Sequence, residues 1–355
     1  MLERSPSLLT ALLRHRLAWP LITLALLLIV NTVFNSSFLR IEWRDGHLYG
    51  SLIDILNRAA PLILVSLGMT LVVATRGIDI SVGAVVAISA AVAAWMIGGS
   101  LVVQDGVATH VSRFPMSVAI VATLAVALAC GAWNGLLVSV VGMQPIIATL
   151  VLMVAGRGVA QLITGGQIIT VYYAPYFFIG NGYLLGLPFA LYIAAAVFVA
   201  LLWLTRRTAL GLFIQAVGIN PTAARVAGVQ ARRLVVGAYA FCGVCAGIAG
   251  LLISSNVKSA DGNNAGQLLE LDAILAVTLG GTALTGGRFS LMGSVIGALI
   301  IQTLTYAIYS LGVPPEINLV VKAVVVFAVM LLQSAEFRAE VRALVQRPVH
   351  EGGRA

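Results

Sequence analysis

Charged residues are scarce in this chain of 355 residues, where Asp, Glu, Lys and Arg together make up only 10%. An ordinary soluble domain carries roughly 25% charged residues. Hydrophobic residues make up 60% of the chain, and its mean hydropathy is +1.02. So few charges cannot cover the outside of a water-soluble core of this size. The composition therefore predicts an integral membrane protein.

The chain has only two lysines and lacks the sequence motifs of nucleotide-binding, metal-binding and hydrolytic proteins. The two lysines, Lys258 and Lys322, do not stand in a G-x-x-x-x-G-K-[ST] sequence, which excludes a P-loop for ATP on this chain. The four histidines are scattered and form no H-E-x-x-H or similar metal spacing. No G-x-S-x-G nucleophile elbow occurs. We therefore expect no catalytic residue, no metal and no cofactor bound by this chain.

Cysteine is limited to three residues, all inside apolar runs, so no disulfide framework is expected. Cys242 and Cys245 form a C-x-x-C pair among small residues, which favours a structural role over redox or metal chemistry. The net charge of +8 does not indicate a nucleic-acid partner, because excess Lys and Arg in a membrane protein usually marks cytoplasmic loops.

Long apolar runs recur along the chain, each close to the roughly 20 residues of a membrane helix. They lack the alternation of β-barrel strands. The expected fold class is therefore all-α, a polytopic membrane protein of about ten transmembrane helices. We expect one membrane domain over 1–355, with a bundle over 17–333 between tails 1–16 and 334–355. The predicted spans are residues 17–39, 55–74, 81–99, 116–140, 145–163, 187–204, 234–253, 269–284, 290–310 and 317–333.

Two segments next to the predicted spans need a separate interpretation. The first run is longer than the apolar region of a signal peptide and no small-residue cleavage site follows it, so we expect a retained span. Segment 51–61 (SLIDILNRAAP) is amphipathic and ends at Pro61, which is typical of an interfacial elbow before the second span.

The distribution of Arg and Lys predicts the orientation. With ten spans and the amino terminus inside, the cytoplasmic segments hold fourteen of these residues and the outer segments hold five, whereas Arg157 and Lys322 fall within spans. Cytoplasmic loops carry the excess of positive charge in membrane proteins. Both termini are therefore expected in the cytoplasm.

Glycine is abundant and predicts close helix packing and a repeat. Small residues at i, i+4 let helices approach closely in lipid, and three glycine pairs have this spacing. Residues 75–88 and 285–298 also share Thr, Gly and Gly at a constant offset, as in the internal repeats of transporters. An inverted repeat and a chance match in a glycine-rich chain both remain open. The glycine pairs are Gly131 with Gly135, Gly243 with Gly247, and Gly293 with Gly297.

Polar residues in or beside the spans are the candidates for a translocation path. The turn TRGIDISVG is either a helix break inside the membrane or a simple turn between helices. Arg157 either lies beside a polar path or pins the structure. The acidic residues Asp79, Glu270, Asp272 and Glu316 are expected at span ends, which argues against a coupling ion. The path candidates are Gly77, Asp79, Ser81, Gly83, Asn134, Arg157, Gln161 and Gln302.

The longest internal loop, residues 205–233, is also the most basic. Asn220 is a good N-cap and Pro221 a good first helical residue, and Gly228 is a good residue to end a helix. The pattern predicts a short helix over 221–227. Such a helix suits docking on another protein, although a solvated surface helix is the alternative.

The same segments resemble the permeases of the ribose, galactose and xylose ATP-binding cassette (ABC) importers. GMTLVVATRGIDISVGAVVAISAA, AVGINPTAARVAGV and LDAILAVTLGGTALTGGRFSLMGSVIGALI match three blocks of that family in order, within residues 50–333. DGHLYGSLIDILNRAAP is similar to the galactofuranose permeases of enteric bacteria. The family's ATPase-coupling positions correspond here to Gly218, Asn220, Ala223, Ala224, Arg225 and Gly228.

The resemblance implies an importer for a monosaccharide, with galactofuranose as one candidate, in the bacterial inner membrane. The implied partners are an ABC ATPase subunit that uses the ATP, a second homologous permease in a heterodimer, a periplasmic sugar-binding protein, the sugar and membrane lipid. The main alternative is an ion-gradient-driven secondary sugar transporter. A membrane enzyme and a purely structural membrane protein are further alternatives.

Overall fold

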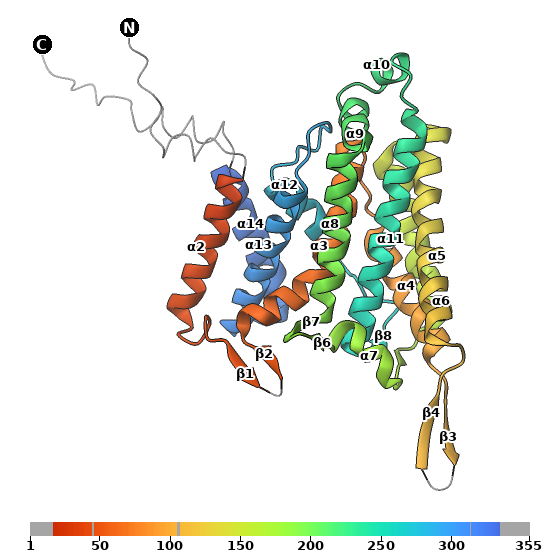
Figure 1. Cartoon of the computed structure of the whole chain (residues 1–355), viewed down its shortest axis with the longest axis vertical. Coiled ribbons are helices and arrows are strands. Elements are labelled where there is room, and N and C mark those ends of the chain that lie inside the picture. Colours follow the sequence, from red (N-terminus) through yellow and green to blue (C-terminus); the bar gives the residue numbers. More distant parts are fainter. Residues whose placement is uncertain (1–16, 45, 105–106, 313, 334–355) are drawn as a thin grey trace, which may run out of the picture.

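The computed structural model describes residues 17–44, 46–104, 107–312 and 314–333. Helices dominate this part of the chain, which confirms the expected all-α polytopic fold (Figure 1). The tails 1–16 and 334–355 lie outside the described residues, so the domain division stays a prediction.

Ten of the described helices coincide with the ten predicted spans. Six of these are long and apolar enough to cross a membrane: α3, α5 with the π-helical turn Leu137–Val141, α6, α8, α11 and α13. The other four are shorter or carry a shorter apolar stretch. The ten are α2 (Ala18–Phe34), α3 (Ser51–Ala74), α4 (Val82–Ile97), α5 (Met116–Leu136), α6 (Pro145–Thr164), α8 (Phe189–Arg207), α11 (Ala231–Val257), α12 (Leu269–Leu279), α13 (Leu291–Ser310) and α14 (Pro315–Gln333).

Short elements close the two ends of the bundle. The remaining helices are α7 (Ala174–Asn181), α9 (Leu210–Ile219) and α10 (Pro221–Val226). Four antiparallel strand pairs are present: β1 (Glu42–Arg44) with β2 (His47–Tyr49), β3 (Ser100–Gln104) with β4 (Val107–Val111), β5 (Ile169–Thr170) with β8 (Ser259–Ala260), and β6 (Tyr183–Leu184) with β7 (Leu187–Pro188). α10 and the β3–β4 hairpin lie at opposite ends of the molecule (Figure 1), which we call the α10 end and the hairpin end.

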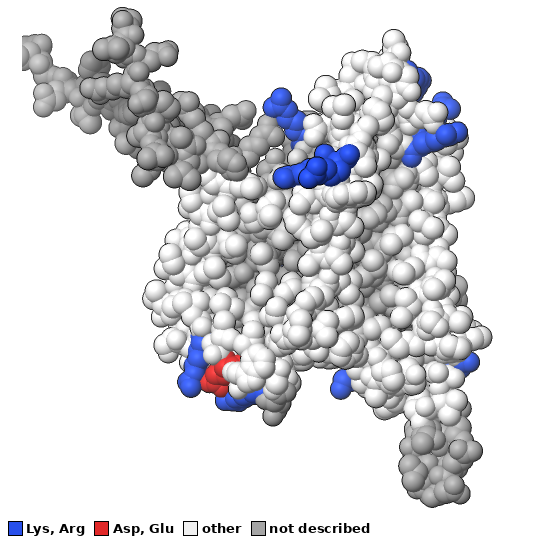
Figure 2. Space-filling view, viewed as in Figure 1, with Lys and Arg blue, Asp and Glu red and all other residues white. Residues whose placement is uncertain are grey.

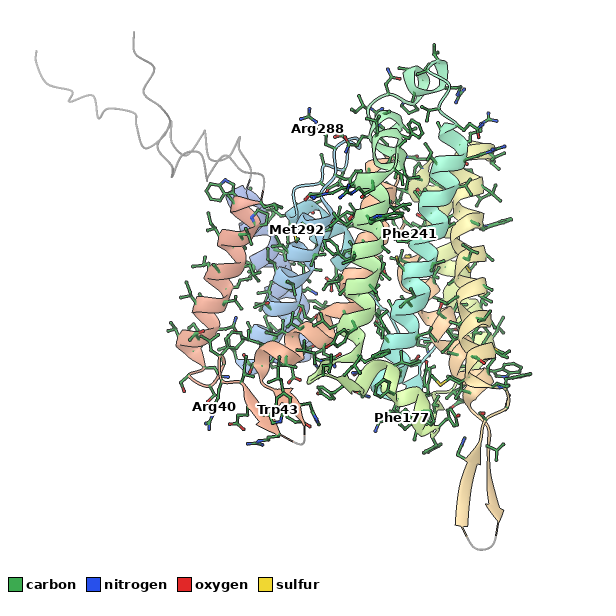
Figure 3. All side chains as sticks on the ribbon, viewed as in Figure 1. Arg40, Trp43, Phe177, Phe241, Arg288 and Met292 are labelled. Carbon is green, nitrogen blue, oxygen red and sulfur yellow. The ribbon has the colours of Figure 1, made fainter. Side chains whose placement is uncertain are left out.

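The centre of the bundle consists of α3, α4 and α11, whose small residues allow close packing. α4 is almost entirely buried. α5 crosses α11 where Gly131 faces Gly243, and a Cβ on either glycine would press on the Cα of the other. The predicted packing role of the Gly131–Gly135 and Gly243–Gly247 pairs is therefore confirmed. The surrounding helices α5, α6 and α8 turn many apolar side chains outward (Figure 3).

The expected elbow over 51–61 is not a separate element. α3 runs without interruption from Ser51 to Ala74 and contains Pro61. Proline has no N–H, so the carbonyl of Asn57 cannot receive its normal bond from the residue four positions later. The sequence pattern that predicted an elbow therefore marks a proline inside a long helix.

Candidate functional site

Three predicted path residues meet in one buried hydrogen-bonded cluster between α3 and α4. Asp79 Oδ1 accepts hydrogen bonds from the backbone N of Ser81 at 3.0 Å and from its hydroxyl at 2.6 Å. Asn134 Nδ2 on α5 donates to Ser81 Oγ at 2.8 Å and more weakly to Asp79 at 3.4 Å. All three side chains are buried. The cluster therefore ties the turn after α3 to α5.

The turn over residues 75–81 lies inside the bundle. Its partners Asn134 and Tyr239 stand seven residues from Val141 and eight from Ala231, where their helices end, which places them roughly 10–12 Å inside at 1.5 Å per residue. The Tyr239 hydroxyl donates to the carbonyl of Ile78 at 3.3 Å. The turn TRGIDISVG is therefore a break inside the helix bundle rather than a turn at its end.

The predicted path glycines of this segment are sites of close approach. Gly77 lies against the Tyr239 hydroxyl, and Gly83 in the first turn of α4 lies against the Glu270 carboxylate and the carbonyl of Gly266. A side chain at either glycine would collide with these groups. The two glycines therefore allow packing and offer no ligand group of their own.

Arg157 and Gln161 on α6 hold the loop that precedes α12. Arg157 Nη1 donates to the carbonyls of Ala265 at 2.5 Å and Asn263 at 3.2 Å, and Gln161 Nε2 donates to Asn263 Oδ1 at 2.5 Å. Of the two roles considered for Arg157, these contacts favour the structural pin.

Asp261 organises the same loop. Its carboxylate accepts hydrogen bonds from the backbone N of Asn263 at 2.8 Å and from the side chain of Asn264 at 2.7 Å. Partial desolvation acts to raise the pKa of Asp261, but these hydrogen bonds and the nearby Arg157 guanidinium hold that pKa below its usual range. The loop is therefore ordered around a charged carboxylate.

Three backbone segments meet in a junction at the α10 end, which the sequence did not predict. The backbone N of Gly287, in the turn before α13, donates to the carbonyl of Ala74 at the end of α3 at 2.9 Å. Gly218 of α9 lies against both, and a Cβ there would overlap the Ala74 oxygen and the Gly287 nitrogen. Arg76 Nη2 donates to the carbonyl of Ile219 at 2.5 Å. The two turns of the suspected repeat thus meet on α9.

The predicted short helix forms at the extreme of the α10 end. Asn220 Oδ1 accepts hydrogen bonds from the backbone N of Thr222 and of Ala223, both at 3.0 Å, which confirms the N-cap. Gly228 adopts a φ of +86°, as expected for a helix-ending glycine. α10 ends at Val226, one residue before the expected end.

The six residues of the predicted coupling segment are not all surface residues. Ala224 is buried in a small apolar cluster with Val217 and Ala231, whereas Arg225 is exposed. Beside it is a groove of about 500 Å³ that carries three arginines. It is lined by Arg225, Gly228, Val229, Gln230, Ala231, Arg232 and Arg233.

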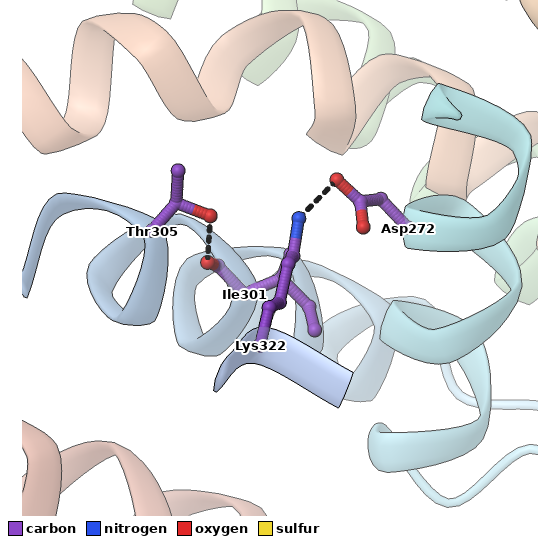
Figure 4. Close-up of polar contacts among 4 residues, drawn as sticks. All are labelled: Asp272, Ile301, Thr305 and Lys322. Atoms are coloured by element: carbon purple, nitrogen blue, oxygen red, sulfur yellow. Dashed lines mark hydrogen bonds and ion pairs between the residues drawn. The ribbon is translucent and has the colours of Figure 1, made fainter. Parts of the chain in front are cut away.

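An ion pair joins α12 to α14. Lys322 Nζ lies 2.6 Å from Asp272 Oδ2, and the two side chains are 14% and 23% exposed (Figure 4). Asp79 and Glu270 are buried. The three acids lie in the turn before α4 or in the first turn of α12, at helix ends as expected, and the chain folds these ends into the bundle.

Gln302 lies apart from the other path candidates, on α13 in the hairpin-end half of the bundle, where it lines two cavities. Within the described part of the chain, no group of three or more His, Cys, Asp or Glu residues could hold a metal ion. The visible face carries its Lys and Arg at the two ends and leaves the sides of the bundle almost free of charge (Figure 2). This distribution suits a protein surrounded by lipid.

Comparison with known proteins defines the class. Residues 51–330 match the family described as the branched-chain amino acid transport system / permease component, and the chain belongs to this family. No solved structure matches the chain.

Three relatives of this chain are named as permeases for a sugar. It is 47% identical to the galactofuranose transporter permease protein YtfT of Escherichia coli (strain K12), over 94% of this chain and 96% of that protein. It is 39% identical to the fructose import permease protein FruF of Bifidobacterium longum (strain NCC 2705), over 91% and 89%. It is 36% identical to the ribose import permease protein RbsC of Bacillus subtilis (strain 168), over 88% and 91%.

These findings confirm the prediction of an ABC importer permease. The chain is a transport component rather than an enzyme, and a multi-pass protein of the inner membrane that works with an ATPase and a substrate-binding partner. The residues that contact the substrate or the ATPase stay predictions.

Proposed function

We propose that this chain is the membrane-spanning permease of a monosaccharide importer, with galactofuranose as the first sugar to test. The support is the consistent naming of its relatives, which are sugar permeases matched over about nine tenths of their length. The ATP is used by a separate ATPase subunit, and this chain binds no cofactor of its own.

The α10 end faces the cytoplasm in this proposal. Its support is the fourteen-to-five excess of Arg and Lys in the segments assigned to that side. α2 begins and α14 ends at the α10 end (Figure 1), so the first and last described residues lie on the same side of the bundle. A sugar-binding protein then delivers its ligand at the hairpin end.

The ATPase binds α9 and α10. Its ATP cycle then opens the translocation path alternately to the two sides of the membrane. The observation that carries this step is the junction of Gly218 with Ala74 and Gly287. Backbone contacts leave no flexible side chain to absorb a displacement, so a shift of α9 acts directly on the end of α3 and on the turn before α13. Both turns lead into buried helices.

A second, related permease completes the path. Its support is the resemblance of segment 45–61 to galactofuranose permeases that work in such pairs. The two chains would then be present in equal amounts in the purified importer. A homodimer is the competing arrangement.

The test is sugar uptake by cells that carry the importer, with energy sources removed one at a time. We expect uptake to stop when ATP is depleted and to continue when the proton gradient is collapsed. The tagged chain, purified in mild detergent, is expected to bring a nucleotide-binding subunit and a second permease. Uptake that follows the proton gradient, with no ATPase recovered, would instead favour the ion-driven carrier.

A further inference from the structure

Two cavities meet in the hairpin-end half of the bundle at Arg58 of α3 and Gln302 of α13, which line both. The first cavity has a volume of about 250 Å³ and extends along α3 to Pro61 and across to Asn256 of α11. The second has a volume of about 440 Å³ and extends toward Tyr309, close to the end of α13. We call the two together the amide chamber.

The position of the chamber, well inside two long apolar helices, favours water or a polar ligand within it. Asn57 and Pro61 stand six and ten residues from the start of α3, and Gln302 stands eight residues before the end of α13, or roughly 9–15 Å from the helix ends. Polar groups facing lipid at that depth are expensive, and they mark substrate pathways in transporters. Asp54 and Arg58, one helical turn apart, are both exposed on this side of α3.

The polar groups of the chamber are incompletely satisfied. Asn57 Oδ1 is buried without a hydrogen-bond partner among the described residues. Pro61 has no N–H for the carbonyl of the same Asn57. Buried polar groups are normally hydrogen-bonded, so an exception needs an explanation such as an absent water or ligand.

The chemistry of the lining fits a neutral molecule with many hydroxyl groups. The amides of Asn57 and Gln302 can each donate and accept hydrogen bonds, as sugar hydroxyls do. Asn256 Nδ2 already donates to the carbonyl of Gly180 and to Asn181 Oδ1, so Asn256 offers its Oδ1 as an acceptor. Leu252 and Ile253 supply apolar surface for the C–H groups of a sugar ring. The charges of Asp54 and Arg58 oppose each other across one turn of α3, so neither sign dominates.

We propose that the amide chamber holds the monosaccharide during its passage, with Gln302 as a direct contact. This inference rests on the proposed function and deepens it, because it assigns the sugar a site within this chain. Losing the hydrogen bonds of one amide lowers transport of the preferred sugar on the order of tenfold.

The first test measures access and protection in right-side-out vesicles that carry the assembled importer. We expect a charged, membrane-impermeant methanethiosulfonate reagent to label the Gln302→Cys variant rapidly. A Val199→Cys variant is the control, because Val199 is 59% exposed on the outside of α8 and lines neither cavity. The native cysteines give the background, with Cys242 and Cys245 buried. A Thr305→Cys variant, in the second cavity, replaces Gln302→Cys if that variant does not fold.

The second test compares radiolabelled D-galactose, D-fructose, D-ribose and L-leucine. We expect the transported sugar to slow labelling of Gln302→Cys. We also expect Gln302→Met, similar in shape but without the amide, to change the ratio of uptake between sugars several-fold, while Gln302→Asn partly restores it. A purely structural defect would lower all uptake equally.

The outcomes separate the two proposals. Sugar uptake by the wild-type importer, with unprotected labelling and an unchanged sugar ratio in Gln302→Met, would overturn the chamber and leave the proposed function standing. Uptake of leucine and of no tested sugar would overturn the proposed function and, with it, the assignment of the chamber to a monosaccharide. Protection by the transported sugar supports both.

Discussion

The two ends of this permease differ in the kind of contact that holds them together. At the α10 end, Gly218, Ala74 and Gly287 bring three backbones into direct contact, and no side chain intervenes. At the hairpin end, long polar side chains such as Arg58 and Gln302 surround open volume. Backbone contacts transmit displacement, whereas flexible side chains around a cavity adapt to a ligand. Under the proposed function, we call the α10 end the driven end, on which the ATPase acts, and the hairpin end the receiving end, which takes up the sugar.

The largest effect is expected from adding a single methyl group where Gly218 contacts Ala74 and Gly287, because it separates the backbone segments of the driven end. Gly218→Ala places a Cβ on the Ala74 oxygen and the Gly287 nitrogen, so the backbones must move apart. Overpacking of this kind costs typically about 1–3 kcal/mol, and we expect sugar uptake to fall more than about tenfold if the cost acts on the transport cycle.

The control for this substitution is Gly237→Ala, because nothing lies within 4 Å of a Cβ at Gly237. Uptake and the amount of each variant in the membrane are measured together. Equal loss of uptake in the two variants, at equal amounts of protein, would contradict the role of the junction in transmission.

The ion pair between Asp272 and Lys322 tests how much the contact between α12 and α14 stabilises the bundle. Removing one partner of a fully buried ion pair typically costs about 3–5 kcal/mol, whereas replacing both by apolar residues is often close to neutral. Because this pair is only partly buried, we expect a smaller loss from removing one partner. We expect Lys322→Met to lower the thermal unfolding temperature in detergent, and Asp272→Leu combined with Lys322→Met to recover most of the loss. Equal unfolding temperatures for the wild type and Lys322→Met would show that the pair contributes little.

Local features of this structure were predictable from sequence, and contacts between distant segments were not. Apolar runs of about 20 residues located the ten helices, and the Asn220, Pro221 and Gly228 signals located α10, because each depends on neighbours along the chain. The junction escaped prediction because Gly218, Ala74 and Gly287 are far apart in sequence and contribute only backbone atoms. Glycine residues in such positions look the same in sequence as glycine residues in any turn.

The candidates for the translocation path also show that sequence does not predict contacts between distant segments. Residue chemistry alone selected Arg157, Gln161 and Gln302 together. The structure assigns the first two to the loop before α12 and places Gln302 beside a cavity. Which polar side chain is satisfied by a protein partner depends on tertiary contacts, which no spacing rule contains.

A smaller effect is expected at the buried cluster of Asp79, Ser81 and Asn134, which anchors the driven end to α5. Asn134→Leu keeps the volume but removes the donor to Ser81 and Asp79, at a cost of about 1–3 kcal/mol for buried groups left without a partner. Thermal unfolding in detergent measures the loss. Trp133→Leu is the control, because Trp133 is exposed on the outer face of the same helix. An equal loss in both variants would assign the effect to α5 in general rather than to the cluster.

The smallest effect is expected at α10, which forms the tip of the driven end. Asn220→Ala removes the side chain that caps α10, at a cost of about 1 kcal/mol in helix stability. Asn220→Asp keeps an acceptor for the same two backbone N–H groups and is the matched control. Hydrogen exchange over residues 221–226 is expected to speed up by roughly fivefold in Asn220→Ala and to change little in Asn220→Asp. Because Gly218 and its partners lie outside α10, exchange at the junction stays unchanged if the tip and the junction are separate units. Faster exchange at both would mean that the cap also holds the three backbones together.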